Sequence, residues 1–176
     1  MEPPEMINAG GVVLKRWEPA WADELALTVR ASLPELTRFM PWAHEGYDVE
    51  DARGFLKLTV DDWESGVAFN YAIFTAVGEL VGAASMMTRM GPDVLEIGYW
   101  IHSAHTGRGY ATAAARSLAS LALTMPGIDR VAIRHDGANA TSASVATKAG
   151  FVEVERFVRP VEAPGESGVA VIRERR

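Results

Sequence analysis

The sequence predicts a mixed α/β (α+β) fold, in which a mostly antiparallel sheet of about seven strands is flanked by about four helices. Two observations lead to it. Strand and helix patterns are interleaved along the chain, and two adjacent strand patterns near its middle are joined by a tight turn. The 176 residues are 48% apolar and 23% charged, which suits a globular core. We expect one domain over residues 1–176.

The first half of the chain supplies one strand and two helices. Residues 11–17 form the strand pattern, and a helix follows over residues 19–32 with apolar positions at helical spacing. Residues 33–42 are short and interrupted by prolines, so no regular element is expected there. Asp48 suits the N-cap of a second helix that extends to residue 63 and ends at a glycine.

The second half alternates strands and helices. Strands are predicted at residues 68–77, 80–89, 94–102, 128–134, 151–160 and 169–173, and helices at residues 110–125 and 139–149. The first two of these strands are separated by Val77-Gly78-Glu79, a hairpin turn. The helix over residues 110–125 must cross over between two strands, and such crossovers are usually parallel and right-handed.

Composition excludes several classes of protein. The chain has no cysteine, so disulfides, thiolate metal sites and a cysteine nucleophile are excluded; its four histidines show no metal-binding spacing, so no metal is expected. The acidic start lacks the apolar run of a signal peptide, and no stretch is long enough to cross a bilayer. A net charge of −6 disfavours nucleic acid. We expect a cytoplasmic protein without membrane contact.

An anion site is predicted where the strand over residues 94–102 leads into the helix that starts near residue 110. Gly107 and Gly109 open that helix, and free backbone N–H groups at a helix start bind phosphate oxygens. Residues 97–128 contain no acid but include Arg108 and Arg116. This pattern favours a polyanionic ligand, and the alternative is a buried alanine-rich helix without room for acids.

The glycine pattern argues against the two common nucleotide sites. A dinucleotide fingerprint needs a third glycine where Thr112 stands. A phosphate-binding loop of the Walker type needs Gly-Lys-Ser/Thr, which is absent.

Four blocks of sequence resemble the GNAT N-acetyltransferase superfamily, which gives the expected fold its GNAT-like form. They are Glu96-Ile97-Gly98-Tyr99-Trp100; Gly107-Arg108-Gly109-Tyr110-Ala111-Thr112, which is similar to motif A; Asn139-Ala140-Thr141-Ser142 with Lys148-Ala149-Gly150-Phe151; and the N-terminal pattern of Leu14-Lys15-Arg16, Asp23 and Met40-Pro41-Trp42. The last block resembles the RimJ/RimL-like branch, which acetylates the N-termini of ribosomal proteins. Two positions depart from the wider family, since Ala104 replaces a common Gln or Arg and Ala146 replaces a tyrosine general acid.

The resemblance implies an acetyl-CoA-dependent N-acyltransferase in which a neutral amine attacks the thioester directly. It implies the following cofactor-binding residues: Trp100 and Ile101 along the pantetheine arm, Gly107, Arg108, Gly109, Tyr110, Ala111 and Thr112 around the pyrophosphate, and Asn139. It also implies that Glu96 accepts the amine proton through water and that Ser142 donates to the leaving thiolate. Met40 and Trp42 are expected on the acceptor side.

Local reasoning leaves alternatives open for both catalytic candidates. Strand alternation places Glu96 on the same face as Gly98 and Trp100, and a carboxylate in mid-strand is costly unless something uses or pairs it. The alternative is an exposed or salt-bridged glutamate. Ser142 lies where helix N-caps occur, so capping is its alternative role.

The acceptor is predicted to be a peptide N-terminal α-amine. Its reference pKa of about 7.7–8.0 leaves roughly a tenth neutral at pH 7, whereas lysine is less favourable by about three units. A small amine such as a polyamine or aminoglycoside is the alternative, as is a non-catalytic acyl-CoA-binding module. Acidic residues between positions 45 and 64 are expected to border the acceptor groove and attract a cationic acceptor, and the alternative is that they are simple helix-end charges. The branch also implies a possible homodimer.

Overall fold

The computed structural model describes residues 2–176 and contains one eight-stranded sheet with the order β1-β2-β3-β4-β5-β6-β8-β7. The strands are β1 (Met6–Asn8), β2 (Val12–Arg16), β3 (Ala68–Thr75), β4 (Leu80–Met87), β5 (Val94–Ile101), β6 (Arg130–Asp136), β7 (Val152–Val158) and β8 (Val169–Arg175). Every neighbouring pair is antiparallel except β5 and β6, which are parallel. The mixed, mostly antiparallel sheet and its parallel crossover are confirmed.

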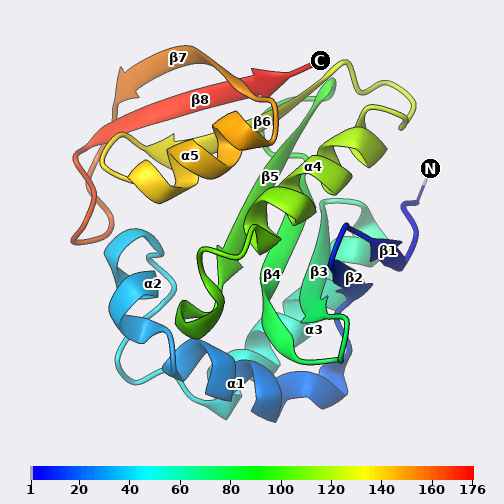
Figure 1. Ribbon diagram of the computed structural model, residues 1–176, viewed down its shortest axis with the longest axis vertical. Helices are drawn as coiled ribbons and strands as arrows, with labels where there is room; N and C mark the ends of the chain where they lie inside the picture. The colour runs from blue at the N-terminus through cyan, green and yellow to red at the C-terminus, as the bar shows by residue number, and fades with distance from the viewer. Residues whose placement is uncertain (1) are drawn as a thin grey trace.

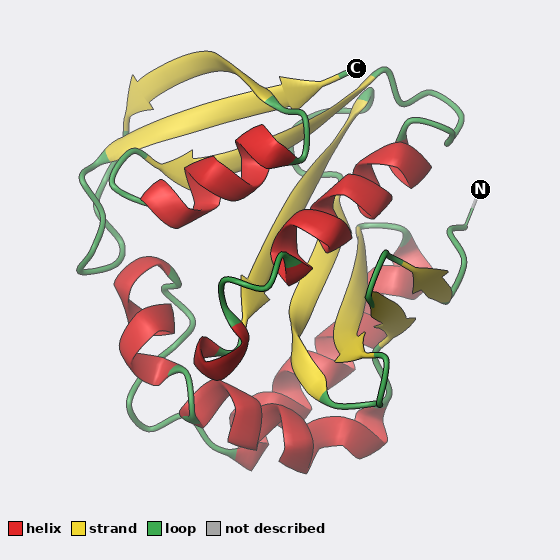
Figure 2. Cartoon of the chain, in the orientation of Figure 1, coloured by secondary structure: helices red, strands yellow, loops and turns green. Residues whose placement is uncertain are grey.

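Five α-helices surround the sheet: α1 (Ala22–Arg30), α2 (Leu33–Phe39), α3 (Val49–Ser65), α4 (Tyr110–Ala122) and α5 (Ala140–Lys148). Helices α1 and α3 pack against one face, whereas α4 and α5 lie together against the other, as Figures 1 and 2 show. Two short 3₁₀ helices, η1 (Pro19–Trp21) and η2 (Ser103–His105), precede α1 and α4.

Two elements were missed by the sequence prediction. Strand β1 is an extra edge strand of only three residues, too short for an alternation pattern. Helix α2 forms where an interrupted segment was expected, because Pro34 falls in its first turn, where no intrahelical N–H donor is needed. The sheet therefore has eight strands in place of about seven, and there are five α-helices in place of about four.

Local capping signals fix the boundaries of α3 as the sequence indicated. The Asp48 carboxylate accepts hydrogen bonds from the backbone N–H groups of Glu50 and Asp51, and the Asp51 side chain accepts one from Asp48 N. Gly66 ends the helix with φ 71°, in the left-handed region. Helix α3 is thereby held as one wall of the site described below.

The largest apolar cluster lies between the sheet and α4. Four alanines of α4 are fully buried, and they let the helix approach the strands closely. A second cluster joins α1, α2 and α3 to the opposite face. Within residues 2–176, no helix has the length and apolarity needed to span a membrane.

Candidate active site

The site begins where β5 and β6 separate. Their parallel pairing covers only Val94, Leu95 and Glu96 on β5. Beyond that point β5 stays paired with β4 as far as Ile101, and β6 stays paired with β8 as far as Asp136. Strand β5 therefore stays paired with β4 and β6 with β8, while β5 and β6 separate from each other and open a wedge in the sheet (Figure 1).

The backbone of the open half of β5 alternates between β4 and the wedge. His102 N donates to Val81 O at 2.8 Å, and hydrogen-bonded pairs alternate along an antiparallel ladder. Trp100 is thus bonded to β4, whereas Tyr99 and Ile101 turn their N–H and C=O groups toward the wedge. Of the two predicted pantetheine-binding residues, Ile101 presents backbone groups there and Trp100 presents its side chain.

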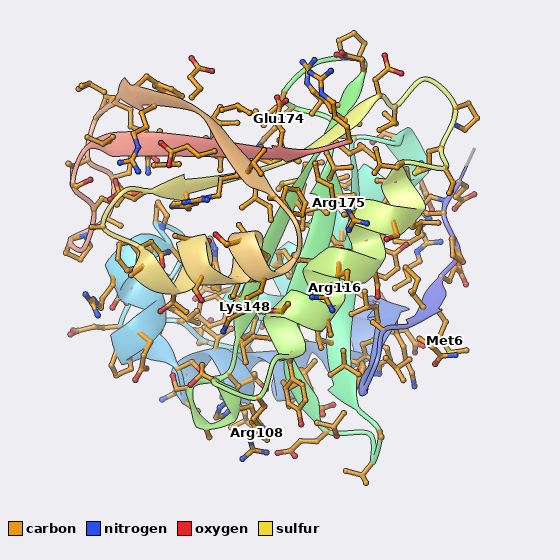
Figure 3. All side chains as sticks on the ribbon, turned by 45° about the horizontal axis from the view of Figure 1, so that its top comes forward. Met6, Arg108, Arg116, Lys148, Glu174 and Arg175 are labelled. Carbon is orange, nitrogen blue, oxygen red and sulfur yellow. The ribbon has the colours of Figure 1, made fainter. Side chains whose placement is uncertain are left out.

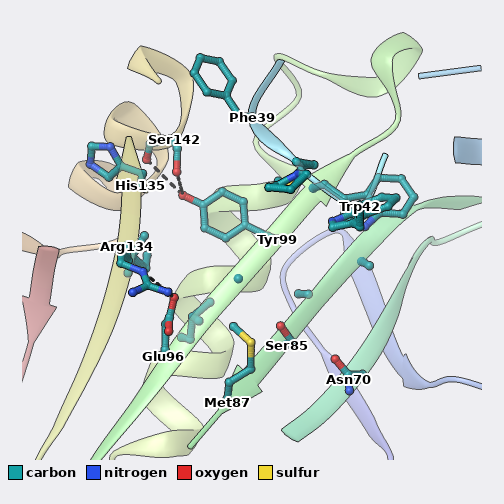
Figure 4. A pocket seen from close by; sticks show the side chains of 18 of the residues that line it. Phe39, Trp42, Asn70, Ser85, Met87, Glu96, Tyr99, Arg134, His135 and Ser142 are labelled. Carbon is teal, nitrogen blue, oxygen red and sulfur yellow. Dashed lines mark hydrogen bonds and ion pairs between the residues drawn. The ribbon is translucent and has the colours of Figure 1, made fainter. Parts of the chain in front are cut away.

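A cavity of about 780 Å³ passes through this wedge. Side chains from both faces of β5 line it, Glu96 and Trp100 from the α3 face and Ile97 and Tyr99 from the α4 face. Figure 4 shows Tyr99 reaching toward α5 while Glu96 turns toward Arg134. A ligand entering from either face of the sheet therefore reaches the same space.

The anion site was predicted at the glycine turn before α4. Gly107 and Gly109 have φ angles of 76° and 80°, which other residues rarely adopt, and Gly109 is the N-cap of α4 without any side-chain cap. Within residues 2–176, the N–H groups of residues 107–112 have no acceptor. A Cβ atom added to either glycine would meet nothing within 4 Å, so the outer side of the turn is open.

These residues fit a diphosphate. The predicted set of Gly107, Arg108, Gly109, Tyr110, Ala111 and Thr112 is brought together with its donors unused. The Arg108 side chain is exposed at the turn (Figure 3), where its one contact in the described chain is Ala104 O at 3.5 Å. Arg116 donates instead to Lys148 O at 2.6 Å, which ties α4 to α5.

Glu96 lies at the closed end of the wedge and is ion-paired. It is 2% exposed, and Arg89 donates to its two carboxylate oxygens at 2.6 and 2.7 Å. Arg134 Nε lies 3.8 Å from the same carboxylate. The hydrogen bonds from Arg89 to Glu96 raise the pKa of Arg89, so the guanidinium stays charged beside the carboxylate. The salt-bridged alternative thus describes the geometry, and the catalytic role of Glu96 stays a prediction.

The start of α5 separates the roles proposed for Asn139 and Ser142. Asn139 Oδ1 accepts from Ser142 N at 3.1 Å, so Asn139 is the N-cap. Its Nδ2 has no partner in residues 2–176, and the side chain lines the cavity. Ser142 Oγ takes no part in capping and lies 2.9 Å from Tyr99 Oη (Figure 4).

Sequence reasoning missed two buried residues at the end of β6. His135 donates from Nδ1 to Asp136 O at 2.8 Å, because its Nε2 must accept from Arg173 Nε at 3.0 Å. Burial lowers the pKa of His135, which keeps it neutral. Both ring nitrogens are occupied, so His135 has no free position for proton transfer.

Asp136 anchors the loop between β7 and β8. Its carboxylate accepts from Ala138 N, Ser167 N and Ser167 Oγ, each at 2.8 Å. Burial raises its pKa, but these hydrogen bonds and one from Gly168 N outweigh that effect and hold the pKa below its usual value. Residues 159, 162 and 166 of the loop line the cavity, so Asp136 shapes one of its walls.

Aromatic side chains form the other end of the cavity. The Trp42 ring lies 6.0 Å from both the Tyr47 ring and the Trp100 ring, between centroids, and Trp42 is 42% exposed. Met40 also lines the cavity, and the place of Met40 and Trp42 on the acceptor side stays a prediction. Of the acidic segment at residues 45–64, only Asp51 lines the cavity, and the Asp48 carboxylate is used as a helix cap. No cluster of three or more metal-ligating side chains occurs in residues 2–176.

A comparison with protein families decides the assignment. The model of the acetyltransferase (GNAT) domain matches residues 12–152. The chain belongs to the GNAT acetyltransferase family. That match contains the wedge, the glycine turn and both catalytic candidates, so the enzyme class predicted from the four blocks is confirmed.

Solved structures share the fold of this GNAT domain over nearly its whole length. The microcin C7 self-immunity acetyltransferase MccE, in complex with acetyl-CoA and AMP, has a TM-score of 0.89 at 21% identity, covering 98% of this chain and 96% of that one. RimL, the ribosomal L7/L12 α-N-protein acetyltransferase in complex with coenzyme A, has a TM-score of 0.88 at 20% identity, with 97% of each chain covered.

Mycobacterium smegmatis RimJ, in complex with CoA-disulfide, has a TM-score of 0.85 at 23% identity, covering 99% of this chain and 89% of that one. Among curated proteins, no sequence match was found. The fold of this chain is thus shared with RimL and RimJ, and acetyl-CoA is the co-substrate that the GNAT acetyltransferase family indicates.

Proposed function

We propose that this GNAT domain transfers the acetyl group of acetyl-CoA to the α-amine of a peptide N-terminus. The observation that carries the proposal is the single cavity through the β5–β6 wedge. It brings Glu96 and the hydroxyl of Ser142 into one space that opens to both faces of the sheet. Helix η2 follows the open end of β5, and the glycine turn with its unused N–H groups comes directly after η2.

The diphosphate is held at that turn by backbone donors and by the dipole of α4. Tyr99 and Ile101 offer main-chain groups to an extended arm in the wedge, as an added strand would require. The free Nδ2 of Asn139 is a further donor on the opposite side. Bound acetyl-CoA supplies the thioester, and these groups orient it.

Proton removal is assigned to Glu96. Arg89 uses one lone pair on each carboxylate oxygen, which leaves the others for a water molecule between Glu96 and the amine. An α-amine with a pKa of about 7.7–8.0 requires little help near neutral pH, so a carboxylate acting through water suffices. Ser142 donates to the sulfur as negative charge develops there.

A thiol-release assay tests the proposal. Acetyl-CoA is supplied with short peptides that carry a free N-terminus, with the same peptides acetylated at that end, and with a polyamine and an aminoglycoside. We expect thiol release with the free peptides and none with the blocked ones, and mass spectrometry should place the acetyl group on the α-nitrogen. Turnover of peptides only at lysine side chains would contradict the assignment.

A small-molecule acceptor is the second candidate. MccE, which shares the fold, is an immunity acetyltransferase crystallised with AMP. In this chain the exposed Trp42 beside Trp100 offers a flat aromatic surface to a compact planar acceptor. Turnover of small amines with inert peptides would favour it, whereas acetyl-CoA binding with no turnover of any amine would indicate a binding module.

A further inference from the structure

The Tyr99 hydroxyl is hydrogen-bonded to the Ser142 hydroxyl, and the Tyr99 side chain has no role in the mechanism described so far. It lies on the part of β5 that has lost β6 as a neighbour. Its hydroxyl crosses the wedge to the first turn of α5, where Oη lies 2.9 Å from Ser142 Oγ and 3.1 Å from Ser142 O (Figure 4). Both side chains line the cavity.

The two contacts define how the protons are shared. A carbonyl oxygen only accepts, so Tyr99 Oη–H is the donor toward Ser142 O. With the proton there, Tyr99 Oη accepts the Ser142 hydroxyl proton. With the Tyr99 proton turned to Ser142 Oγ, the Ser142 hydroxyl is free to donate elsewhere. The two arrangements differ only in which of two adjacent acceptors Tyr99 uses.

We infer that Tyr99 is a positioning residue that holds the Ser142 hydroxyl toward the leaving thiolate. As charge develops on sulfur, the Ser142 proton turns to it and the Tyr99 proton replaces that lost hydrogen bond. Chains of hydrogen bonds in a low-dielectric site strengthen one another. No bond is made or broken at Tyr99, and the inference rests on the proposed role of Ser142.

Direct proton donation by Tyr99 is disfavoured. Burial raises the pKa of Tyr99 to about 12, although its hydrogen bond with Ser142 opposes part of that rise. A thiol titrates near 8.5. Transfer from Tyr99 to a thiolate is therefore uphill by more than three pKa units, so Tyr99 keeps its proton and acts through Ser142.

A double-mutant cycle tests the inference with Tyr99→Phe, Ser142→Ala and the combined variant. Each single substitution removes one hydroxyl and leaves the packing volume almost unchanged. We expect kcat to fall about tenfold in Tyr99→Phe with the KM for acetyl-CoA within about twofold of wild type, because only transition-state alignment is lost. The combined variant should be no slower than Ser142→Ala alone.

Tyr71→Phe is the matched control. Tyr71 is buried and its hydroxyl donates to Pro4 O at 2.9 Å, but it does not line the cavity. Its loss should lower thermal stability and leave kcat unchanged. If Tyr99→Phe behaves in the same way, or if the two effects multiply in the combined variant, the inference about Tyr99 is wrong while Ser142 retains its role.

Other outcomes separate the inference from the proposed function. Wild-type kcat in Ser142→Ala removes Ser142 from the reaction and overturns the inference with it, although acetyl transfer itself stands. Absence of turnover by the wild-type protein, despite acetyl-CoA binding, overturns the proposed function instead. A calorimetric titration with acetyl-CoA therefore accompanies the cycle.

Discussion

The two ends of the site are built from different parts of the chain. At the glycine turn, donors come from the backbone of one continuous segment, residues 107–112. At the closed end of the wedge, Glu96 meets Arg89 and Arg134, whose side chains come from different elements. The first end depends on a few φ angles and the second on long-range pairing, so the ends should respond differently to substitution.

The largest effect is expected at the side-chain end, from Glu96→Gln. General-base catalysis contributes roughly 10²–10⁴-fold, so kcat should fall by about 100-fold or more. Arg89 is 55% exposed and remains solvated without its carboxylate partner, so the fold should persist. The measurement is steady-state kinetics with a free N-terminal peptide, with the KM for acetyl-CoA expected within about twofold of wild type.

Glu174→Gln provides the comparison for that variant. Glu174 pairs with Arg130 at 3.2 Å on the neighbouring strand and does not line the cavity. Its removal should leave kcat unchanged. Wild-type kcat in Glu96→Gln as well would show that Glu96 only balances the charge of Arg89 and Arg134.

The next effect concerns stability and comes from Asp136→Asn. The hydrogen bonds that hold the pKa of Asp136 below its usual value stabilise the ionised native state. Because the folded-state pKa is depressed, that stabilisation is present above the unfolded value of about 3.9 and is lost as the pH falls through the folded value. We expect the variant to lose about 2 kcal/mol at pH 7.

Urea unfolding at a series of pH values measures the difference. It should be constant from pH 7 to about 5 and should shrink steadily below about pH 4. An Asp93→Asn variant, which removes a half-exposed partner of Arg130, should change stability by less than about 0.5 kcal/mol. A pH-independent difference for Asp136→Asn would contradict an ionic contribution.

Features that depend on one local segment could be predicted from the sequence, whereas contacts between distant segments could not. Asp48 caps α3 with its own side chain, and Gly66, Gly107 and Gly109 adopt positive φ angles, so these features are local and their positions were predicted correctly. Glu96 and Ser142 also reach one cavity, because strand alternation and helix capping place them locally. Their chemical roles remain predictions.

What could not be predicted depends on contacts between distant segments. Tyr99 and Ser142 are 43 residues apart, and no pattern within either segment shows that they meet. The same is true of Arg134, which lies on β6 and reaches Glu96 on β5. Arg89 lies only seven residues before Glu96, but exposed arginines are common in any strand or turn, so nothing marks it as the partner. Helix α2 was missed for a local reason, because prolines were taken as breaks when Pro34 suits a first helical turn.

The backbone end is tested by Gly109→Val. A β-branched residue is strained at φ 80°, so the turn must change shape and misalign its free N–H groups. We expect the KM for acetyl-CoA to rise about tenfold, which corresponds to about 1.4 kcal/mol of binding, with kcat within about threefold. Gly54→Ala is the control, because Gly54 lies within α3 at ordinary φ, and it should leave KM unchanged.

The smallest effect is expected from Trp42→Leu at the aromatic end. Trp42 is already 42% exposed, so its loss should cost little stability. It should raise the KM for the acceptor about threefold while the KM for acetyl-CoA stays constant, because Trp42 is not part of the turn proposed to hold the diphosphate. Among the described aromatic rings, the Trp42 ring lies beside those of Tyr47 and Trp100. The difference in this KM increase between two acceptors is the more informative measurement. The KM should rise more for a flat aromatic amine than for a peptide with an aliphatic first residue, since only the aromatic amine stacks on the ring face of Trp42. An equal rise in KM for both acceptors would mean that Trp42 closes the cavity without selecting the acceptor. Acceptor specificity would then depend on the Glu96 cluster alone.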